Sequence, residues 1–249
     1  MHDFTRALSA ELLKARRTAA LWVAILAPLL VVGIQTIVMS QIDQPTWGAD
    51  NAWVWLQRST GAMWALFVFP MLIALITTLT NAHEHNSRGW KQLFALPVNR
   101  QAVYLAKLAL SCGLLLIATM VLWGSYLTAG WVMSVIKPDF GLGAPAPMAQ
   151  TLLTFVQIFS AAGLLISLHH WISARYASFA IAIGVGVAGT FIGMVQAKGL
   201  FQKLFPWKLP MNIQSNDPDM IPIALLVGIL GGLALAVIGS ISYCRRDVV

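Results

Sequence analysis

The stretch Met220–Cys244, MIPIALLVGILGGLALAVIGSISYC, is 25 residues long and contains no Asp, Glu, Lys or Arg. A helix of about 20 mostly apolar residues is long enough to cross the hydrocarbon core of a bilayer. A charge at mid-membrane costs roughly 2.5–3.5 kcal/mol on the insertion scale, so a run of this length without charges is typical of a transmembrane helix.

Five further runs share this lack of charge: Thr18–Ile42, Ser59–Ala82, Leu108–Ile136, Phe140–Ala174 and Tyr176–Ala197. We therefore predict an all-α, polytopic membrane protein with six transmembrane helices. The spans are expected near residues 19–41, 60–82, 105–134, 149–172, 176–197 and 221–243. The fourth is expected to start near Met148, after the loop Gly141–Pro147. No polar segment is long enough for a second domain, so residues 1–249 are expected to form one transmembrane domain.

The composition points to the same fold class. Hydrophobic residues make up 58% of the chain, charged residues only 10%, and the mean hydropathy is +0.75. A soluble domain carries about 25% charged residues, so a soluble enzyme and a disordered chain are both excluded. The formal net charge of +7 is expected to orient the helices and to meet anionic membrane lipid, not nucleic acid. The two cysteines, Cys112 and Cys244, are too few for a disulfide framework.

The distribution of charge predicts the orientation of the spans. With both chain ends placed inside, the inner segments hold 11 Lys and Arg residues and the outer loops hold 5, which favours both termini in the cytoplasm. Tryptophans lie near both ends of the spans, as in an aromatic belt. Trp123 falls in the middle of the third span, where we expect it to face another helix.

Residues 1–17 are expected to form an amphipathic helix on the inner membrane surface. Its apolar residues recur at helical spacing, with basic residues on the opposite side. The apolar residues are Phe4, Ala7, Leu8, Leu12 and Ala15. A basic flank that only sets the topology is the alternative.

The segment 83–100, between the second and third spans, is expected to hold another short helix at the inner surface. Its apolar face at helical spacing consists of Trp90, Leu93, Phe94 and Pro97. Glu84 and Arg88 are placed for an i,i+4 pair, and Pro97 is expected to end the helix. Such a helix can rest on the membrane and offer its charged side to a partner. A surface connector without a partner is the alternative.

On the outer side, the segment Lys198–Pro210 alternates apolar and aromatic residues with lysines. We interpret it as an anchor that dips into the outer headgroup region. An outer gate, or a contact with a lipid-like substrate, is the alternative.

No motif for a metal, a nucleotide or catalysis stands out. His83-Glu84-His85 is not His-Glu-x-x-His, and the adjacent His169 and His170 are expected to be solvated at an inner helix end. There is no Gly-x-x-x-x-Gly-Lys-Ser/Thr loop, so we expect no nucleotide site in this chain. The spans are expected to contain none of the charged residues that ion-gradient transporters carry. If the protein moves a substrate, its energy must come from elsewhere.

Small residues mark close helix packing in the fifth and sixth spans. Glycines at four-residue spacing are typical of tight helix contacts. The candidates are Gly184, Gly189, Gly193, Gly228 and Gly232. They are candidates for a contact between two chains, although packing within one chain is the interpretation we favour.

The residues around the inner segment resemble a known family. The stretch Glu84…Asn86-Ser-Arg-Gly-Trp-Lys-Gln-Leu-Phe-Ala-Leu-Pro-Val-Asn-Arg100…Tyr104-Leu-Ala-Lys107 is similar to permease subunits of ABC-2 type ABC transporters, above all the peptide-antibiotic (lantibiotic) immunity branch. There, an acidic residue after the second span precedes a short helix, a Leu-Pro-Val turn and a third span that opens with Ala-Lys. The stretch Arg175–Gly189 also resembles the fifth span of that branch.

The resemblance implies a multi-pass permease of the bacterial cytoplasmic (inner) membrane. It would pair with a second permease, the same or a homologous chain, and dock on cytoplasmic ABC ATPase subunits. ATP and Mg would bind to those subunits, and this chain would hold no cofactor. A coupling helix would run from Glu84 to Leu96. The residues expected to meet the ATPase are Glu84, Arg88, Trp90, Lys91, Leu93 and Phe94.

By the same resemblance, the transporter would export a hydrophobic or amphipathic compound, such as a peptide antibiotic, handled between two permeases at spans two and five. A non-transporting sensor or assembly subunit, which binds a cytoplasmic partner through residues 83–100, is the alternative. An intramembrane enzyme acting on lipids would need paired catalytic groups at one depth, and only the adjacent His169 and His170 come close.

Overall fold

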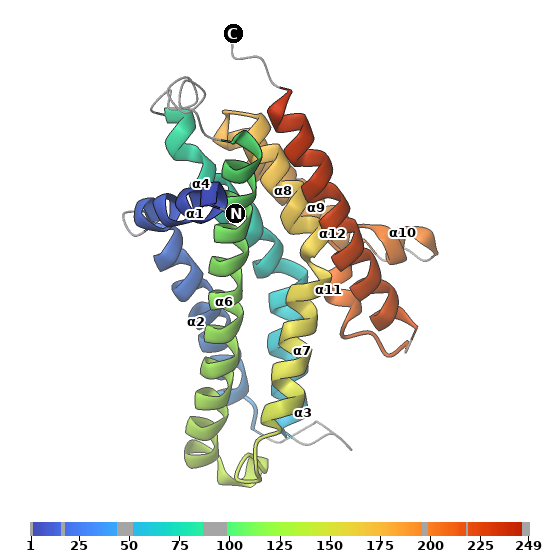
Figure 1. The fold of residues 1–249 in the computed structure, drawn as a ribbon. Coiled ribbons are helices and arrows are strands. Elements are labelled where there is room, and N and C mark those ends of the chain that lie inside the picture. Colours follow the sequence, from blue (N-terminus) through green and yellow to red (C-terminus); the bar gives the residue numbers. More distant parts are fainter. Residues whose placement is uncertain are drawn as a thin grey trace.

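The computed structural model describes residues 2–15, 18–43, 52–86, 99–195, 199–217 and 219–245. Within these ranges all regular structure is helical, as the sequence predicts (Figure 1). The long elements are α1 (His2–Ala15), α2 (Ala20–Ser40), α3 (Ala52–Met63), α4 (Phe69–Asn86), α6 (Arg100–Ile136), α7 (Met148–Ala161), α8 (Gly163–Arg175), α9 (Phe179–Met194) and α12 (Met220–Cys244). The short ones are η1 (Trp64–Val68), η2 (Pro138–Phe140), α10 (Leu200–Leu204) and α11 (Leu209–Asn212).

Four helical stretches are long and apolar enough to cross a membrane: Ala20–Ser40, Ala52–Ala82, Arg100–Ile136 and Met220–Cys244. The pair α7–α8, bent by 42°, is a fifth candidate if it counts as one span. The fifth predicted span is represented by α9, which has only 16 residues. At 1.5 Å per residue it is about 24 Å long, shorter than the hydrocarbon core of about 30 Å. The described residues therefore support four or five spans of full length.

The helices pack side by side around an apolar core. α6 packs against α2, and α1 crosses the first turns of α6. α4 packs against α8 and α9, and α12 runs along α8. The start of α6 and the ends of α4, α8 and α12 lie together at one end of the bundle, at the top of Figure 1. We call this the inner end.

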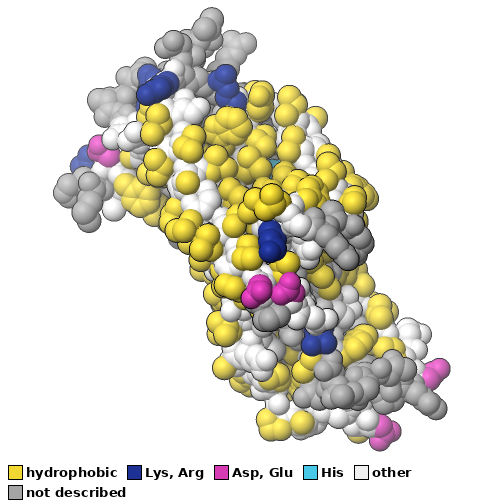
Figure 2. Space-filling view, turned by 90° about the vertical axis from the view of Figure 1, so that its right-hand side faces the viewer, with side chains coloured by type: hydrophobic (Ala, Val, Ile, Leu, Met, Phe, Trp, Pro, Cys, Tyr) yellow, Lys and Arg dark blue, Asp and Glu magenta, His cyan; other side chains and the backbone are white. Residues whose placement is uncertain are grey.

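The outside of the bundle is apolar. α2 and α12 turn large aliphatic side chains outward, among them Leu30 (58% exposed) and Leu233 (61%). Figure 2 shows hydrophobic side chains over much of one face; Lys and Arg lie near its upper rim, and further basic and acidic side chains lie near its middle and lower part. Trp22 and Trp131, near opposite ends of the predicted spans, are both exposed. Trp123 faces another helix, as predicted, because its indole N–H donates to Thr151 Oγ1 of α7 (3.3 Å).

The second span begins earlier than the sequence predicts. The helix starts at Ala52 and continues through η1 into α4, so Arg58 lies in α3 and not in an outer loop. η1 is a π-helical turn just before Pro70, with the Phe69 N–H bonded to Trp64 O. Proline has no N–H, and its ring clashes with the carbonyl four residues earlier in a regular α-helix. The wider turn accommodates this ring without ending the helix.

The fourth span bends instead of running straight. α7 begins at Met148, the residue expected from the sequence, and the bend falls at Ala162, between α7 and α8. Ser160 and Gly163 flank the bend, and Gly/Ser positions are a common cause of sharp kinks. At Gly163 a Cβ atom would lie 2.7 Å from Gly228 O, so α12 packs closely against the bend.

The third span contains a charge, which corrects the expectation that the spans carry none. α6 has 37 residues and includes Lys107, which is only 1% exposed. Such a helix is about 55 Å long and extends beyond the hydrocarbon core. Lys107 lies about 10 Å from its inner end. The charge is tolerated there because it is paired, as described next.

Candidate functional site

The ends of the predicted coupling segment are set by α4 and α6. α4 ends at Asn86, and α6 begins at Arg100. Asn99 caps α6, because its side chain accepts a hydrogen bond from the Gln101 N–H (2.9 Å). Glu84 lies in the last turn of α4. The other predicted contacts lie outside the described residues and stay predictions: Arg88, Trp90, Lys91, Leu93, Phe94 and the helix-ending Pro97.

Two turns into α6, a buried ion pair joins three helices. Lys107 Nζ lies 2.7 Å from Glu11 Oε2 of α1 and donates to the Thr80 carbonyl of α4 at 3.1 Å. The other carboxylate oxygen of Glu11 accepts from Lys14 Nζ at 2.7 Å. Glu11 is 3% exposed. Removing charges from water is costly unless their hydrogen-bonding capacity is used. This geometry therefore holds α1, α4 and α6 in one defined arrangement.

The buried carboxylate changes the interpretation of residues 1–17. The segment is helical, as predicted, but α1 turns Glu11 toward the bundle while Leu12 is 49% exposed. The expected contact of Leu12 with the inner membrane surface stays a prediction. Leaving Lys107 buried without an acid would cost more than exposing one leucine. The signal in the sequence is that Glu11 stands at helical spacing from Phe4, Leu8 and Ala15.

Further polar side chains cross from α6 through α4 to α8. Thr80 Oγ1 lies 3.1 Å from Ser111 Oγ. Asn81 Nδ2 donates to Ser173 Oγ at 3.0 Å. All four side chains are buried. We call the combined set the polar cluster: Glu11, Thr80, Asn81, Lys107, Ser111 and Ser173. It lies directly below the two ends of the predicted coupling segment.

The two histidines are buried, which corrects the expectation that they are solvated. His169 and His170 are both 0% exposed. His170 Nε2 lies 3.2 Å from the Tyr104 carbonyl of α6. His169 meets the edge of Trp207, with ring centroids 5.5 Å apart. α8 is covered on several sides by α4, α9 and α12, so a position near its end is not a position in water.

Trp207 of the outer segment packs against other helices of the bundle. Within it, α10 exposes Leu200 (73%), in the manner of an interfacial anchor, but Trp207 and Leu209 are buried. A Cβ on Gly189 would come within 2.1 Å of the Trp207 ring, and one on Gly193 within 3.2 Å of the Trp207 Cβ. Trp207 and Leu209 therefore pack within the bundle, while the headgroup contact of the segment stays a prediction.

The other candidate glycines differ in their surroundings. A Cβ on Gly228 would lie 2.3 Å from Ala161 O, and one on Gly232 would lie 2.6 Å from Gly163 C. These two glycines pack α12 against the bend between α7 and α8. A Cβ on Gly184 would meet nothing within 4 Å, so a contact of Gly184 with a second chain stays a prediction.

A partly polar cavity of about 230 Å³ is lined mainly by residues between 202 and 215, where these meet the second and fifth predicted spans. Leu66 of η1 and Gly193 and Met194 of α9 form one side. Lys208, Asn212 and residues around them form the other. Because both apolar and hydrogen-bonding groups line it, the cavity suits an amphipathic group.

The chain matches the family model described as ABC-2 family transporter protein over residues 7–193. This match covers well over half of the 249 residues, so the chain belongs to the ABC-2 family of transporter proteins. It is thus a multi-pass membrane permease, and membership implies an ABC ATPase as its partner. The matched region includes Glu11, Lys107 and both ends of the predicted coupling segment. No curated protein and no solved structure matches the chain.

Proposed function

We propose that this chain is the permease subunit of an ATP-driven exporter, on which a separate ATPase acts through residues 83–100. The observation that carries the proposal is the Glu11–Lys107 ion pair, with Lys107 also bonded to Thr80. It braces α1, α4 and α6 where the segment leaves and re-enters the bundle. Because the ion pair connects these three helices, a force that the ATPase applies to residues 83–100 would move the helices together and would not merely bend the loop.

We further propose six spans with both termini in the cytoplasm. In this topology α9 is the fifth span, and α10 and α11 complete the outer side where α9 is short. The excess of basic residues in the inner segments supports this orientation. So does the position of α1 and of the end of α12, in the same half of the bundle as the ends of α4 and α8 (Figure 1).

The proposed substrate is a hydrophobic or amphipathic compound, such as a peptide antibiotic, moved with the help of a second permease. The cavity between η1 and α9 supports this class, since it combines Leu66 and Met194 with Lys208 and Asn212. It also borders spans two and five, where relatives of the resembling branch handle their substrates.

The test uses the tagged chain purified from membranes with the proteins that accompany it. We expect an ABC ATPase to co-purify and its ATP hydrolysis to be stimulated by the permease in nanodiscs. Glu84→Arg and Arg88→Glu should each reduce that stimulation at least tenfold. Each substitution would set a charge of the permease against a charge of the same sign on the ATPase. Arg6→Glu, on the exposed side of α1 at the same end of the bundle, is the matched control.

Two results would contradict the proposal. Full stimulation and full resistance to peptide antibiotics in both charge-reversed variants would exclude the role of the 83–100 helix. Co-purification of a partner that does not hydrolyse ATP would instead support the sensor or assembly subunit. Membrane insertion of every variant is checked by its yield in the membrane fraction.

A further inference from the structure

An apolar groove of about 270 Å³ runs between α6, the α7–α8 bend and α12. Leu108 and Cys112 of α6, Ile166 of α8 and Ala236 of α12 line it. Its rim residue Leu233 is 61% exposed, so the groove opens sideways, toward the surroundings of the bundle. The lining is almost entirely carbon, which suits a hydrocarbon chain.

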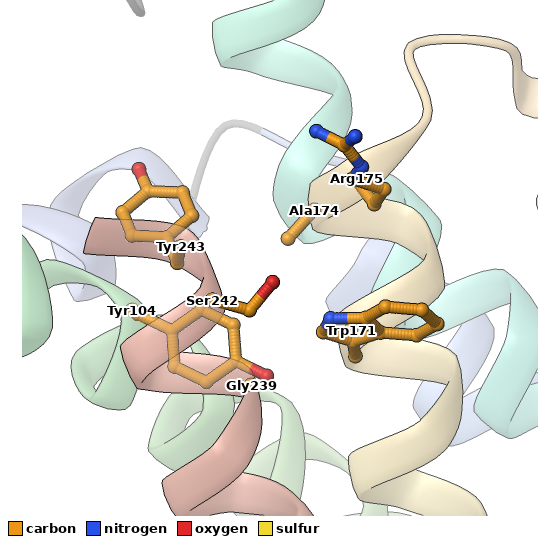
Figure 3. Close-up of a pocket in the computed structure, with 7 residues that line it drawn as sticks. All are labelled: Tyr104, Trp171, Ala174, Arg175, Gly239, Ser242 and Tyr243. Atoms are coloured by element: carbon orange, nitrogen blue, oxygen red, sulfur yellow. The ribbon is translucent and has the colours of Figure 1, made fainter. Parts of the chain in front are cut away.

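The same three helices line a second, smaller cavity closer to the inner end (Figure 3). Tyr104 precedes Leu108 by one turn of α6, and Gly239 follows Ala236 by about one turn of α12. On α8, Trp171 continues the line from the groove in the same way. The two cavities are therefore consecutive parts of one track along the same helix faces.

The inner part of the track offers hydrogen-bond donors and a positive charge. Tyr104, Trp171, Arg175, Gly239 and Ser242 belong to it, and we call them the inner-end site. Tyr104 is 1% exposed, and its hydroxyl has no hydrogen-bond partner among the described residues. A Cβ on Gly239 would lie 2.2 Å from that hydroxyl, so glycine is what lets the ring reach α12.

We infer that this track binds one anionic phospholipid of the leaflet at the inner end. One acyl chain lies in the groove, and the phosphate meets the guanidinium of Arg175 and the hydroxyl of Ser242. The inner cavity holds only about 10 Å³, roughly one water, so the phosphate lies at its mouth. Arginine binds phosphate through two parallel N–H donors. Tryptophan, here Trp171, is enriched at the depth of the lipid headgroups.

The dimensions of the track agree with this ligand. On α12, Ile229 at the far end of the groove and Ser242 at the inner-end site are 13 residues apart. At 1.5 Å per residue they are about 20 Å apart along the helix, somewhat more than half of a hydrocarbon core of about 30 Å. A phospholipid of one leaflet, measured from its phosphate to the end of an acyl chain near the midplane, spans a similar length. Basic pockets between helices at the cytoplasmic surface are typical sites for anionic headgroups.

The test measures quenching of Trp171 by brominated lipids in nanodiscs that contain the full chain. The Trp171 signal is the difference between the natural chain and Trp171→Phe. Brominated phosphatidylglycerol should quench it at a mole fraction roughly tenfold lower than brominated phosphatidylcholine, because a charge-assisted hydrogen bond contributes about that factor. Arg175→Gln should remove this preference, whereas Arg6→Gln should keep it.

A second pair of variants tests the groove. Ala236→Phe fills it and should lower quenching by both lipids, while Val237→Phe changes the neighbouring, 57% exposed residue and should not. Circular dichroism and the elution volume of each variant show whether it folds. If Ala236→Phe does not fold, the Arg175→Gln result decides alone. These measurements need no ATPase, so their outcome is independent of the proposed transport function.

Three outcomes would overturn the inference. Equal quenching by the two lipids would mean that the headgroup is not recognised. Full competition by millimolar glycerol phosphate would identify a site for a soluble phosphate compound. Protection of Trp171 from both lipids would mean that a protein, such as a second copy of the chain, covers the groove.

Discussion

The Lys107 side chain is accommodated inside the bundle because two oxygens from different helices accept hydrogen bonds from its Nζ. Glu11 neutralises the charge, and the Thr80 carbonyl takes a further donor. Such a pair does not by itself add much stability compared with a well-packed apolar pair. Its contribution is to specificity, because α1 must lie where Glu11 reaches Lys107.

The pairing predicts that losing one partner destabilises the protein more than losing both. Glu11→Gln leaves Lys107 buried without an acid, and Lys107→Met leaves Glu11 with Lys14 alone. Breaking a buried pair in this way costs about 3–5 kcal/mol. We therefore expect each single variant to lower the midpoint of thermal unfolding in detergent clearly.

The double variant Glu11→Leu, Lys107→Met is the matched comparison. It removes both charges and should recover most of the lost stability, because an apolar pair of similar size replaces the ion pair. If ATPase coupling stays low in this stable double variant, the ion pair serves coupling and not only folding. Single variants as stable as the natural chain would contradict the pairing.

At the scale of elements, the contact of α12 with the α7–α8 bend depends on the absence of side chains. Gly228 and Gly232 face backbone atoms of Ala161 and Gly163. Backbone atoms cannot move aside as the end of a flexible side chain can. The bend brings backbone atoms close to α12, and the glycines of α12 leave room for them. Each feature therefore depends on the other.

We expect Gly228→Ala to destabilise the protein by about 1–3 kcal/mol, the usual cost of overpacking. Gly184→Ala is the control, because its new Cβ would meet nothing within 4 Å and alanine favours a helix over glycine by up to about 1 kcal/mol. Thermal unfolding of both variants in detergent provides the measurement. Equal effects of the two substitutions would show that α12 does not lie this close to the bend.

For the whole molecule, we expect six crossings of the bilayer, with the 16-residue α9 as the fifth. Three single-cysteine chains test this expectation, with the thiol at Cys244, at Asp139→Cys or at Asp217→Cys and the other native cysteines replaced by serine. Asp139 and Asp217 are both exposed. In right-side-out membrane vesicles, a membrane-impermeant maleimide should label positions 139 and 217 directly. Position 244 should react only after permeabilisation. Label at 217 that requires permeabilisation would show that α9 does not cross.

Much of the architecture follows from local patterns. Charge-free runs locate α2 and α12 to within a residue or two, and Pro147 and the glycines before it place the start of α7. The family resemblance on the stretch from Glu84 to Lys107 agrees with the ABC-2 match. The start of the second span at Ala52 was missed, because Arg58 interrupts the apolar run although the helix carries it.

The sequence by itself determined that this chain is a helical membrane protein. The length of an apolar run and the cost of placing a charge in the membrane can both be read along the chain, without knowing which residues meet. It did not determine which charges are buried together. Glu11 and Lys107 are 96 residues apart, and their pairing depends on how α1 rotates against α6. The burial of His169 beside Trp207 and the track beside Tyr104 likewise arise only where distant helices meet. The free energy of each of these contacts depends on how two helices pack against each other. Only the tertiary structure therefore decides them.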